Sequence, residues 1–211
     1  MSVTDHQRVE WSAALRSNLE PLTDLHGIVQ DRLDRHDALE TTLTEALETV
    51  ERERTEDSDA LSMLSAASED AVRRARLVGV KLEMRFLENA ITDEAYRSVL
   101  AGAFPAGVHS VGATPALRHE ALLRIVGALG QHSEADPDDE LGAIAREGAD
   151  AIDAANNEAK REREQTQAAA DAVSVARIEF DRAYQATKEI LSGLLRDAER
   201  LGELRDIFPD M

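Results

Sequence analysis

The stretch that decides the fold is residues 152–208, which read IDAANNEAKREREQTQAAADAVSVARIEFDRAYQATKEILSGLLRDAERLGELRDIF. One position recurs in it every seven residues and is apolar or threonine each time: Ile152, Ala159, Thr166, Val173, Phe180, Thr187, Leu194, Leu201 and Phe208. The position three residues later is also mostly apolar, with Glu162 and Asp197 as the exceptions. A seven-residue repeat of this kind predicts a long helix whose apolar stripe packs against other helices.

No proline interrupts the chain between Pro137 and Pro209, so we expect one helix over residues 138–205. At about 1.5 Å per residue this helix would be roughly 100 Å long, which predicts an elongated molecule. The first part of its stripe is rich in alanine and would let a partner helix approach closely. The last part, with Phe180, Leu194 and Leu201, should anchor more strongly.

The N-terminal part of the chain predicts another long helix. Thr4 and Gln7 have the spacing of a capping box. Apolar residues follow at helical spacing: Leu15, Leu19, Leu22, Leu25, Val29, Leu33, Leu43, Leu47 and Val50. Pro21 should kink this helix or start it afresh. We interpret the charged run at residues 51–57 as a turn or a solvated helix end.

A further long helix is expected over residues 58–89. Its apolar face comprises Leu61, Leu64, Ala71, Ala75, Val78, Leu82 and Phe86. Leu77, Met84, Leu87 and Ile91 widen this face, which predicts contact with two neighbours. Thr92 should cap a short helix, and Thr114-Pro115 is a favourable start for another, with threonine as N-cap and proline at the first helical position.

These elements predict an all-α fold, an elongated antiparallel helical bundle or coiled coil with three long helices and one or two short ones. We expect a single domain in three parts. Residues 1–101 form a helical hairpin plus a short helix, 102–114 form a connection rich in Gly and Pro, and 115–211 form a short helix plus the long heptad helix.

Composition excludes several classes of function. With 42 acidic and 24 basic residues the net charge is −18, which repels nucleic-acid phosphates and disfavours anionic membranes. The chain has no cysteine, and therefore no disulfide or thiolate site. It contains no phosphate-binding loop and no Gly-x-Ser-x-Gly motif, so we expect no enzymatic activity and no cofactor. The N-terminus has no apolar signal-peptide core, and we expect a cytoplasmic protein.

One helix is locally basic, with Arg73, Arg74, Arg76, Lys81 and Arg85. The simpler interpretation is that these side chains pair with acids on a neighbouring helix of the same chain. The alternative is that Arg73, Arg74 and Arg76 form a patch that meets an acidic helix of another copy.

Residues 98–117 carry no Asp, Glu, Lys or Arg. The favoured interpretation is a buried connection between helices, because the segment is rich in glycine, proline and other small residues. The alternative is an exposed apolar loop, as in a membrane-acting helical protein.

His26 and His36 lie on or beside the apolar stripe of the first helix, and Glu40 follows His36 by one helical turn. A histidine and a carboxylate at this spacing share a helix face, so a metal-binding bundle is a second alternative. The opposing interpretation is that polar residues in a heptad core set its register. The pair His119-Glu120 begins like a zinc-protease helix, but position 123 is leucine and the second histidine is missing.

The heptad stripe must be covered, and the other expected helices are too short to cover all of it. We therefore expect a non-enzymatic structural or adaptor protein that self-associates or binds another helical protein through its helix faces. The expected partner-binding residues are Arg73, Arg74, Arg76, Phe180, Leu194 and Leu201.

Overall fold

The computed structural model describes residues 4–23, 26–108 and 110–208, and it is 87% helical with no strand among them. The predicted all-α fold is therefore confirmed. Two helices are long, α2 with 61 residues and α5 with 58, and they pack against each other. In chain order the elements are α1 (Asp5–Leu19), η1 (Glu20–Leu22), α2 (Gly27–Leu87), α3 (Asp93–Ala103), α4 (Pro115–Gln131), η2 (Ser133–Ala135), α5 (Glu140–Asp197), η3 (Leu201–Glu203) and α6 (Leu204–Ile207).

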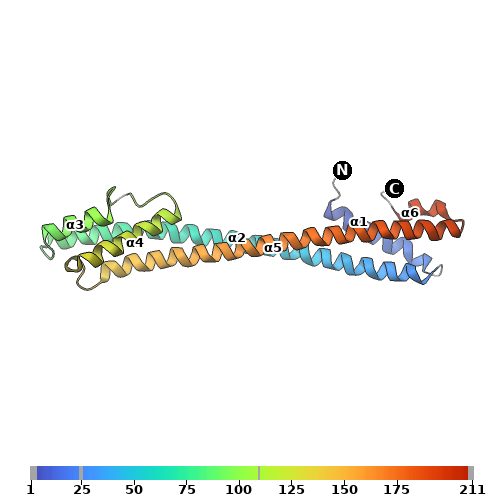
Figure 1. Ribbon diagram of the computed structural model, residues 1–211, viewed down its shortest axis with the longest axis horizontal. Helices are drawn as coiled ribbons and strands as arrows, with labels where there is room; N and C mark the ends of the chain where they lie inside the picture. Colours follow the sequence, from blue (N-terminus) through green and yellow to red (C-terminus); the bar gives the residue numbers. More distant parts are fainter. Residues whose placement is uncertain (1–3, 24–25, 109, 209–211) are drawn as a thin grey trace. The chain divides into compact units, whose positions relative to one another are not determined.

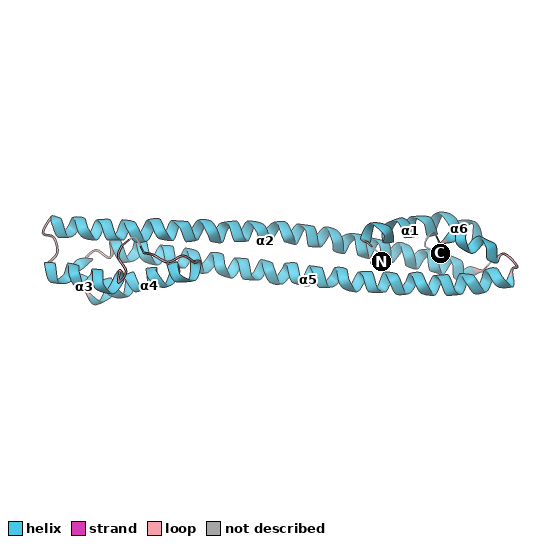
Figure 2. Ribbon diagram, turned by 90° about the horizontal axis from the view of Figure 1, so that it is seen from above, coloured by secondary structure: helices cyan, strands magenta, loops and turns pink. Residues whose placement is uncertain are grey.

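The chain divides into two compact units, and α2 and α5 each contribute to both. The terminal unit comprises residues 1–54 and 165–211, and includes α1 and α6. The central unit comprises residues 55–164, and includes α3 and α4. Figure 1 traces the helices by sequence colour, and Figure 2 gives the second view of them.

In the central unit, four helices enclose one apolar core. Buried side chains come from α2 (Ala71, Ala75, Val78, Leu82), α3 (Val99, Ala103), α4 (Leu122, Ile125, Leu129) and α5 (Leu141, Ala145, Ile152). The caps expected from the sequence are present: Thr92 accepts a hydrogen bond from the Ala95 N–H, and Thr114 accepts one from the Leu117 N–H. Gly112 just before α4 has a φ of 96°, and a Cβ at this position would lie 2.7 Å from that of Leu117. Glycine is therefore required there.

The terminal unit has a second core that contains most of the chain's aromatic side chains. It joins Leu15 and Leu19 of α1, Phe180 and Tyr184 of α5, and Phe208. The predicted capping box at the start of α1 is present, since Thr4 and Gln7 cap each other's backbone N–H groups. The helix stops before Pro21 and the chain starts afresh at α2, as the proline predicted. Leu25 of the predicted stripe lies outside the described residues.

The predicted helix end at residues 51–57 is wrong, because α2 runs through this segment without interruption. The run consists largely of Glu and Arg, which favour helix in any context. Arg54 also forms an ion pair of 2.7 Å with Glu51, one turn earlier. The apolar positions on either side, Val50 and Ala60, are both buried. Charge density alone was therefore a poor helix-stop signal, and the chain has two long helices where three were predicted.

The limits of α5 also differ from the predicted range of 138–205. The helix begins at Glu140, and the Asp136 carboxylate accepts the N–H groups of Leu141 and Gly142 at 3.0 and 2.7 Å. It ends at Asp197 because Glu199 adopts a φ of 60° and the Arg200 N–H bonds back to the Leu195 carbonyl. This is a Schellman ending, in which glycine usually takes the left-handed position. Glu199 occupies it here, so the sequence contained no visible stop signal.

Candidate functional site

An apolar stripe on α2 faces away from the core of the central unit. Its members are Leu77, Val80, Met84 and Leu87, which are 44, 51, 52 and 69% exposed. They follow one another at steps of three, four and three residues, which is the spacing of a heptad seam. The sequence assigned Leu77, Met84, Leu87 and Ile91 to contacts with a second neighbouring helix. Ile91 is buried in the core of the central unit, whereas the other three are exposed within the described part of the chain. We call Leu77, Val80, Met84 and Leu87 the α2 stripe.

Arg74 of the predicted basic patch is engaged inside the central unit. It donates to Asp70 on its own helix at 2.6 Å and to Glu147 on α5 at 2.7 Å. These hydrogen bonds, that with Asp70 first, raise the pKa of Arg74 above its ordinary value. Gly148 makes room for the arginine stem, since a Cβ there would lie 2.9 Å from Arg74 Cδ.

Lys81 and Arg85 contact the segment at the start of α5. Arg85 is nearly buried and forms ion pairs with Asp136 at 2.9 Å and with Asp138 at 2.7 Å. Lys81 pairs with Glu140. Of the five basic residues, Arg74, Lys81 and Arg85 thus pair with acids across the helices of their own unit.

Arg73 and Arg76 are exposed at the N-terminal end of the α2 stripe. The side chain of Arg73 is 68% exposed and contacts Asp70, one turn earlier on the same helix, at 3.2 Å. The part of the predicted basic patch that faces solvent is therefore this pair of arginines, directly next to exposed apolar side chains.

A second exposed apolar surface lies on α5 in the terminal unit. Val175 and Ile178 are 55 and 52% exposed. Asp171 and Glu179, one turn before and one residue after them, are exposed as well. We call these four residues the α5 patch. It combines apolar and acidic side chains, whereas the N-terminal end of the α2 stripe combines apolar and basic ones.

The three predicted apolar anchors of the last heptads have different surroundings. Phe180 is fully buried, and its ring lies 5.8 Å from that of His36 and 6.2 Å from that of Tyr184. Leu194 is half-buried against the core of the terminal unit. Leu201 is 45% exposed and belongs to η3, because α5 ends before it. The structure does not gather the three on one helix face.

The weak metal candidates His26, His36 and Glu40 each have a different environment. His26 is exposed at the start of α2, where its Nδ1 accepts the Ile28 N–H at 3.1 Å. His36 is buried, and its Nε2 lies 3.0 Å from the Thr187 hydroxyl. Glu40 accepts from Arg16 at 3.1 Å. Among the residues that the structure describes, these three do not bring their ligand atoms together around one position.

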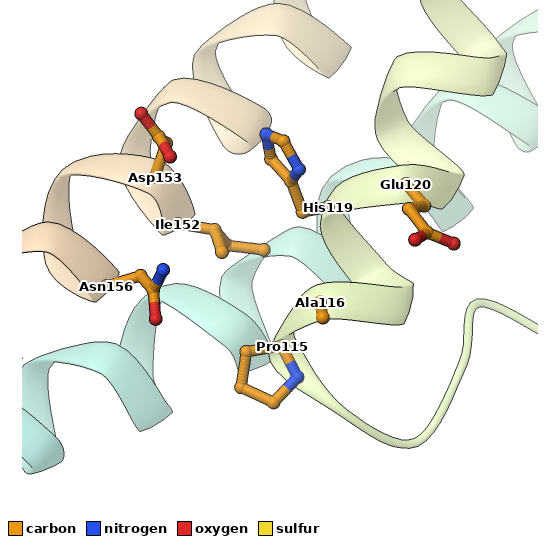
Figure 3. A pocket seen from close by; sticks show the side chains of 7 residues that line it. All are labelled: Pro115, Ala116, His119, Glu120, Ile152, Asp153 and Asn156. Carbon is orange, nitrogen blue, oxygen red and sulfur yellow. The ribbon is translucent and has the colours of Figure 1, made fainter.

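A small hollow lies between α4 and α5 in the central unit (Figure 3). Its volume is about 170 Å³, and its lining includes His119, Ile152, Asp153 and Asn156. His119 points toward α5, whereas Glu120, which also contributes to the lining, points in a different direction from α4 (Figure 3). The two residues that resemble the beginning of a zinc-protease motif thus do not face one another.

The uncharged segment 98–117 contributes to the core of the central unit. Val99, Ala103, Phe104 and Val111 are buried in it, while Leu117 is half exposed. The predicted burial of this segment is confirmed for these four side chains. Over the described residues, none of the helices combines the length and apolar character that crossing a membrane requires.

Sequence reasoning missed Val80 and the α5 patch as exposed surface. The spacing of Leu77, Val80, Met84 and Leu87 was a readable signal, because it is a second heptad seam beside the one that forms the core. Val175 and Ile178 lack such a repeat, so only the structure identifies them. Comparisons of the chain with protein-family models, with curated proteins and with solved structures find no match.

Proposed function

We propose that this chain is a non-enzymatic structural protein of the cytoplasm that self-associates through its helix faces. In this proposal the α2 stripe of one copy packs on the α5 patch of another. The observation that carries the proposal is the exposed heptad seam of Leu77, Val80, Met84 and Leu87. Single exposed apolar residues need no explanation, but a continuous row of them is typical of an interaction surface.

The pattern of residues supports one particular register between the two surfaces. A parallel alignment of the helices places Leu77 opposite Val175 and Val80 opposite Ile178, so that apolar side chains meet in successive layers. The next layer toward the N-terminus then places Arg73 opposite Asp171. All these positions are exposed in the unit that carries them.

Charges at the edges of the seam support the same register. In this register Leu77 and Val175 occupy position a of their heptads, and Val80 and Ile178 occupy position d. Arg76, just before Leu77, is then at position g, and Glu179, just after Ile178, is at position e. In parallel coiled coils, residues at these two flanking positions face each other and set partner choice. The alignment therefore provides the Arg76–Glu179 pair in addition to Arg73–Asp171.

Such a contact joins two different surfaces. When two copies meet, one copy keeps an unused α5 patch and the other keeps an unused α2 stripe. Interfaces of this type produce rings or open chains rather than a closed two-fold dimer. We therefore expect the mass in solution to rise with concentration beyond that of a dimer.

The experiment is sedimentation velocity on the wild type and on charge variants over a range of micromolar concentrations. Wild type should sediment as a dimer and larger species. Arg76→Glu should shift the protein toward monomer because it places two glutamates face to face. The double variant Arg76→Glu/Glu179→Arg should regain association, since it restores the pair with its charges exchanged.

Arg97→Glu is the matched control, because Arg97 is also an exposed arginine and pairs with Asp93, one turn earlier in α3. It should associate as the wild type does. A wild type that stays monomeric at every concentration would overturn the proposal. Undiminished association of Arg76→Glu would overturn this interface.

A further inference from the structure

The heptad stripe of α5 contains one buried carboxylate in the central unit. Glu162 occupies a position that is otherwise filled mainly by alanine in this part of the stripe, and it is only 4% exposed. Its Oε1 accepts a hydrogen bond of 2.7 Å from Arg161, the preceding residue. Its Oε2 is buried and has no hydrogen-bond partner among the described residues. A buried carboxylate oxygen without a hydrogen-bond partner is costly, so a native structure that keeps one needs an explanation.

A second carboxylate approaches Glu162 from the facing helix. An oxygen of Glu56 on α2 lies within 4.8 Å of an oxygen of Glu162, and both residues belong to the central unit. At this separation two carboxylates repel each other, which adds to the cost of burying one of them. Both costs are removed by a positive charge placed between the two side chains.

Glu56 and Glu162 lie in an acidic groove that is open to solvent. A groove between α2 and α5 is lined by Glu56, Asp59, Glu158 and Glu162, with Arg161 and Met63 among its other residues. Arg161 is mostly exposed, and its Nη2 is divided between Glu158 at 2.5 Å and Glu162 at 2.7 Å. On Glu162 the Arg161 guanidinium bonds to Oε1 rather than to the buried Oε2.

We propose that this groove binds a hard divalent cation, Mg²⁺ or Ca²⁺, through the carboxylates of Glu56 and Glu162. Oxygen atoms are the ligands that both ions prefer. Mg²⁺ in particular is commonly held by one or two carboxylates and keeps several waters, and the open groove leaves room for these. The bound ion gives Glu162 Oε2 a partner and joins α2 to α5 at this level of the central unit.

The test is isothermal titration calorimetry of the metal-free protein with MgCl₂ and with CaCl₂. We expect saturable binding of one ion per chain. Glu162→Gln and Glu56→Gln should each weaken it by about 10- to 100-fold, since removing even an outer partner of a metal ligand has an effect of this size. Glu164→Gln is the matched control, because Glu164 is exposed on the same helix two residues further on. It should bind as the wild type does.

Circular dichroism should verify that each variant is folded, and Glu56→Gln serves as the independent test if Glu162→Gln is not. A second readout is the thermal midpoint, which should rise with added Mg²⁺ or Ca²⁺ in wild type and Glu164→Gln only. The proposal is overturned if neither ion binds saturably at millimolar concentration, or if both glutamine variants bind as tightly as the wild type.

Discussion

At the scale of single residues, His36 is the most unusual side chain of the terminal unit. It is 2% exposed, and within the part of the chain that the structure describes its Nδ1 has no hydrogen-bond partner. Burial, followed by the nearby charges of Arg32 and Arg35 and opposed by Asp37, lowers the pKa of His36 to about 4. The ring is therefore neutral at pH 7 and acts as a polar member of an aromatic core.

This shift predicts a loss of stability in mild acid. Because the folded-state pKa lies below the ordinary value of 6.5, protonation favours the unfolded chain. The contribution of neutral His36 to the free energy of unfolding is complete above about pH 6.5 and is lost as the pH falls toward 4. A shift of this size corresponds to about 3 kcal/mol. Urea unfolding followed by the fluorescence of Trp11 should detect it, because this single tryptophan stacks on Tyr184 in the same core.

His36→Gln is the control for this titration, since glutamine retains a polar group near Thr187 but does not ionise. Its unfolding free energy should vary much less than that of the wild type between pH 6.5 and 4. Equal pH dependence in the two proteins would show that other groups cause the loss. The partner of His36 lies 151 residues away in the chain, so the sequence could place His36 beside an apolar stripe but could not identify Thr187.

At the scale of elements, the start of α5 is held to α2 by a nearly buried ion pair. The side chain of Asp136 is 3% exposed and caps α5 through two backbone N–H groups, and Arg85 supplies its counter-charge. The sequence could not reveal that this carboxylate, besides capping α5, needs a cation from another helix.

We therefore expect Arg85→Met to destabilise the central unit by about 3 kcal/mol, because it leaves a buried carboxylate without its cation. Methionine keeps much of the apolar stem, so that the lost charge dominates the effect. Amide hydrogen exchange in α4, which belongs to the same unit, gives the change in opening free energy. Arg97→Met removes an exposed pair with Asp93 and should cost less than about 1 kcal/mol. Similar losses in both variants would argue against a special role for Arg85.

Long helices were the most predictable elements, and their ends were the least predictable. The periodic apolar positions of α5 are largely buried from Ile152 through Thr187, as the heptads indicated. Its C-terminal end depends on Glu199 in a left-handed conformation, and no pattern of side chains in the sequence predicts that conformation. In α2, the charged run 51–57 suggested an end, yet the residues on both sides of it belong to the same helix.

At the scale of the whole molecule, charge and exposed apolar surface act in opposite directions. A net charge of −18 opposes contact between copies at long range, whereas the proposed register joins apolar layers and two opposite-charge pairs at short range. The composition of the chain reveals the long-range repulsion directly. The short-range contacts depend on which sides of α2 and α5 remain exposed after each unit has packed, and the heptads alone do not determine that.

These two effects have different ranges, and this predicts how self-association depends on salt. At 0.01 M ionic strength the screening length is about 30 Å, so most charges of two approaching copies repel one another. At 0.15 M it falls to about 8 Å, which removes most of the long-range repulsion but leaves contacts within the interface largely intact. Wild-type association should therefore strengthen between these two conditions, measured by light scattering at fixed protein concentration. Arg76→Glu should remain weaker than the wild type at both, because its defect lies inside the interface. If salt instead dissociated the wild type steadily from 0.01 M upward, the charge pairs rather than the apolar layers would provide most of the binding energy, and Leu77 and Val80 would not be the main source of affinity.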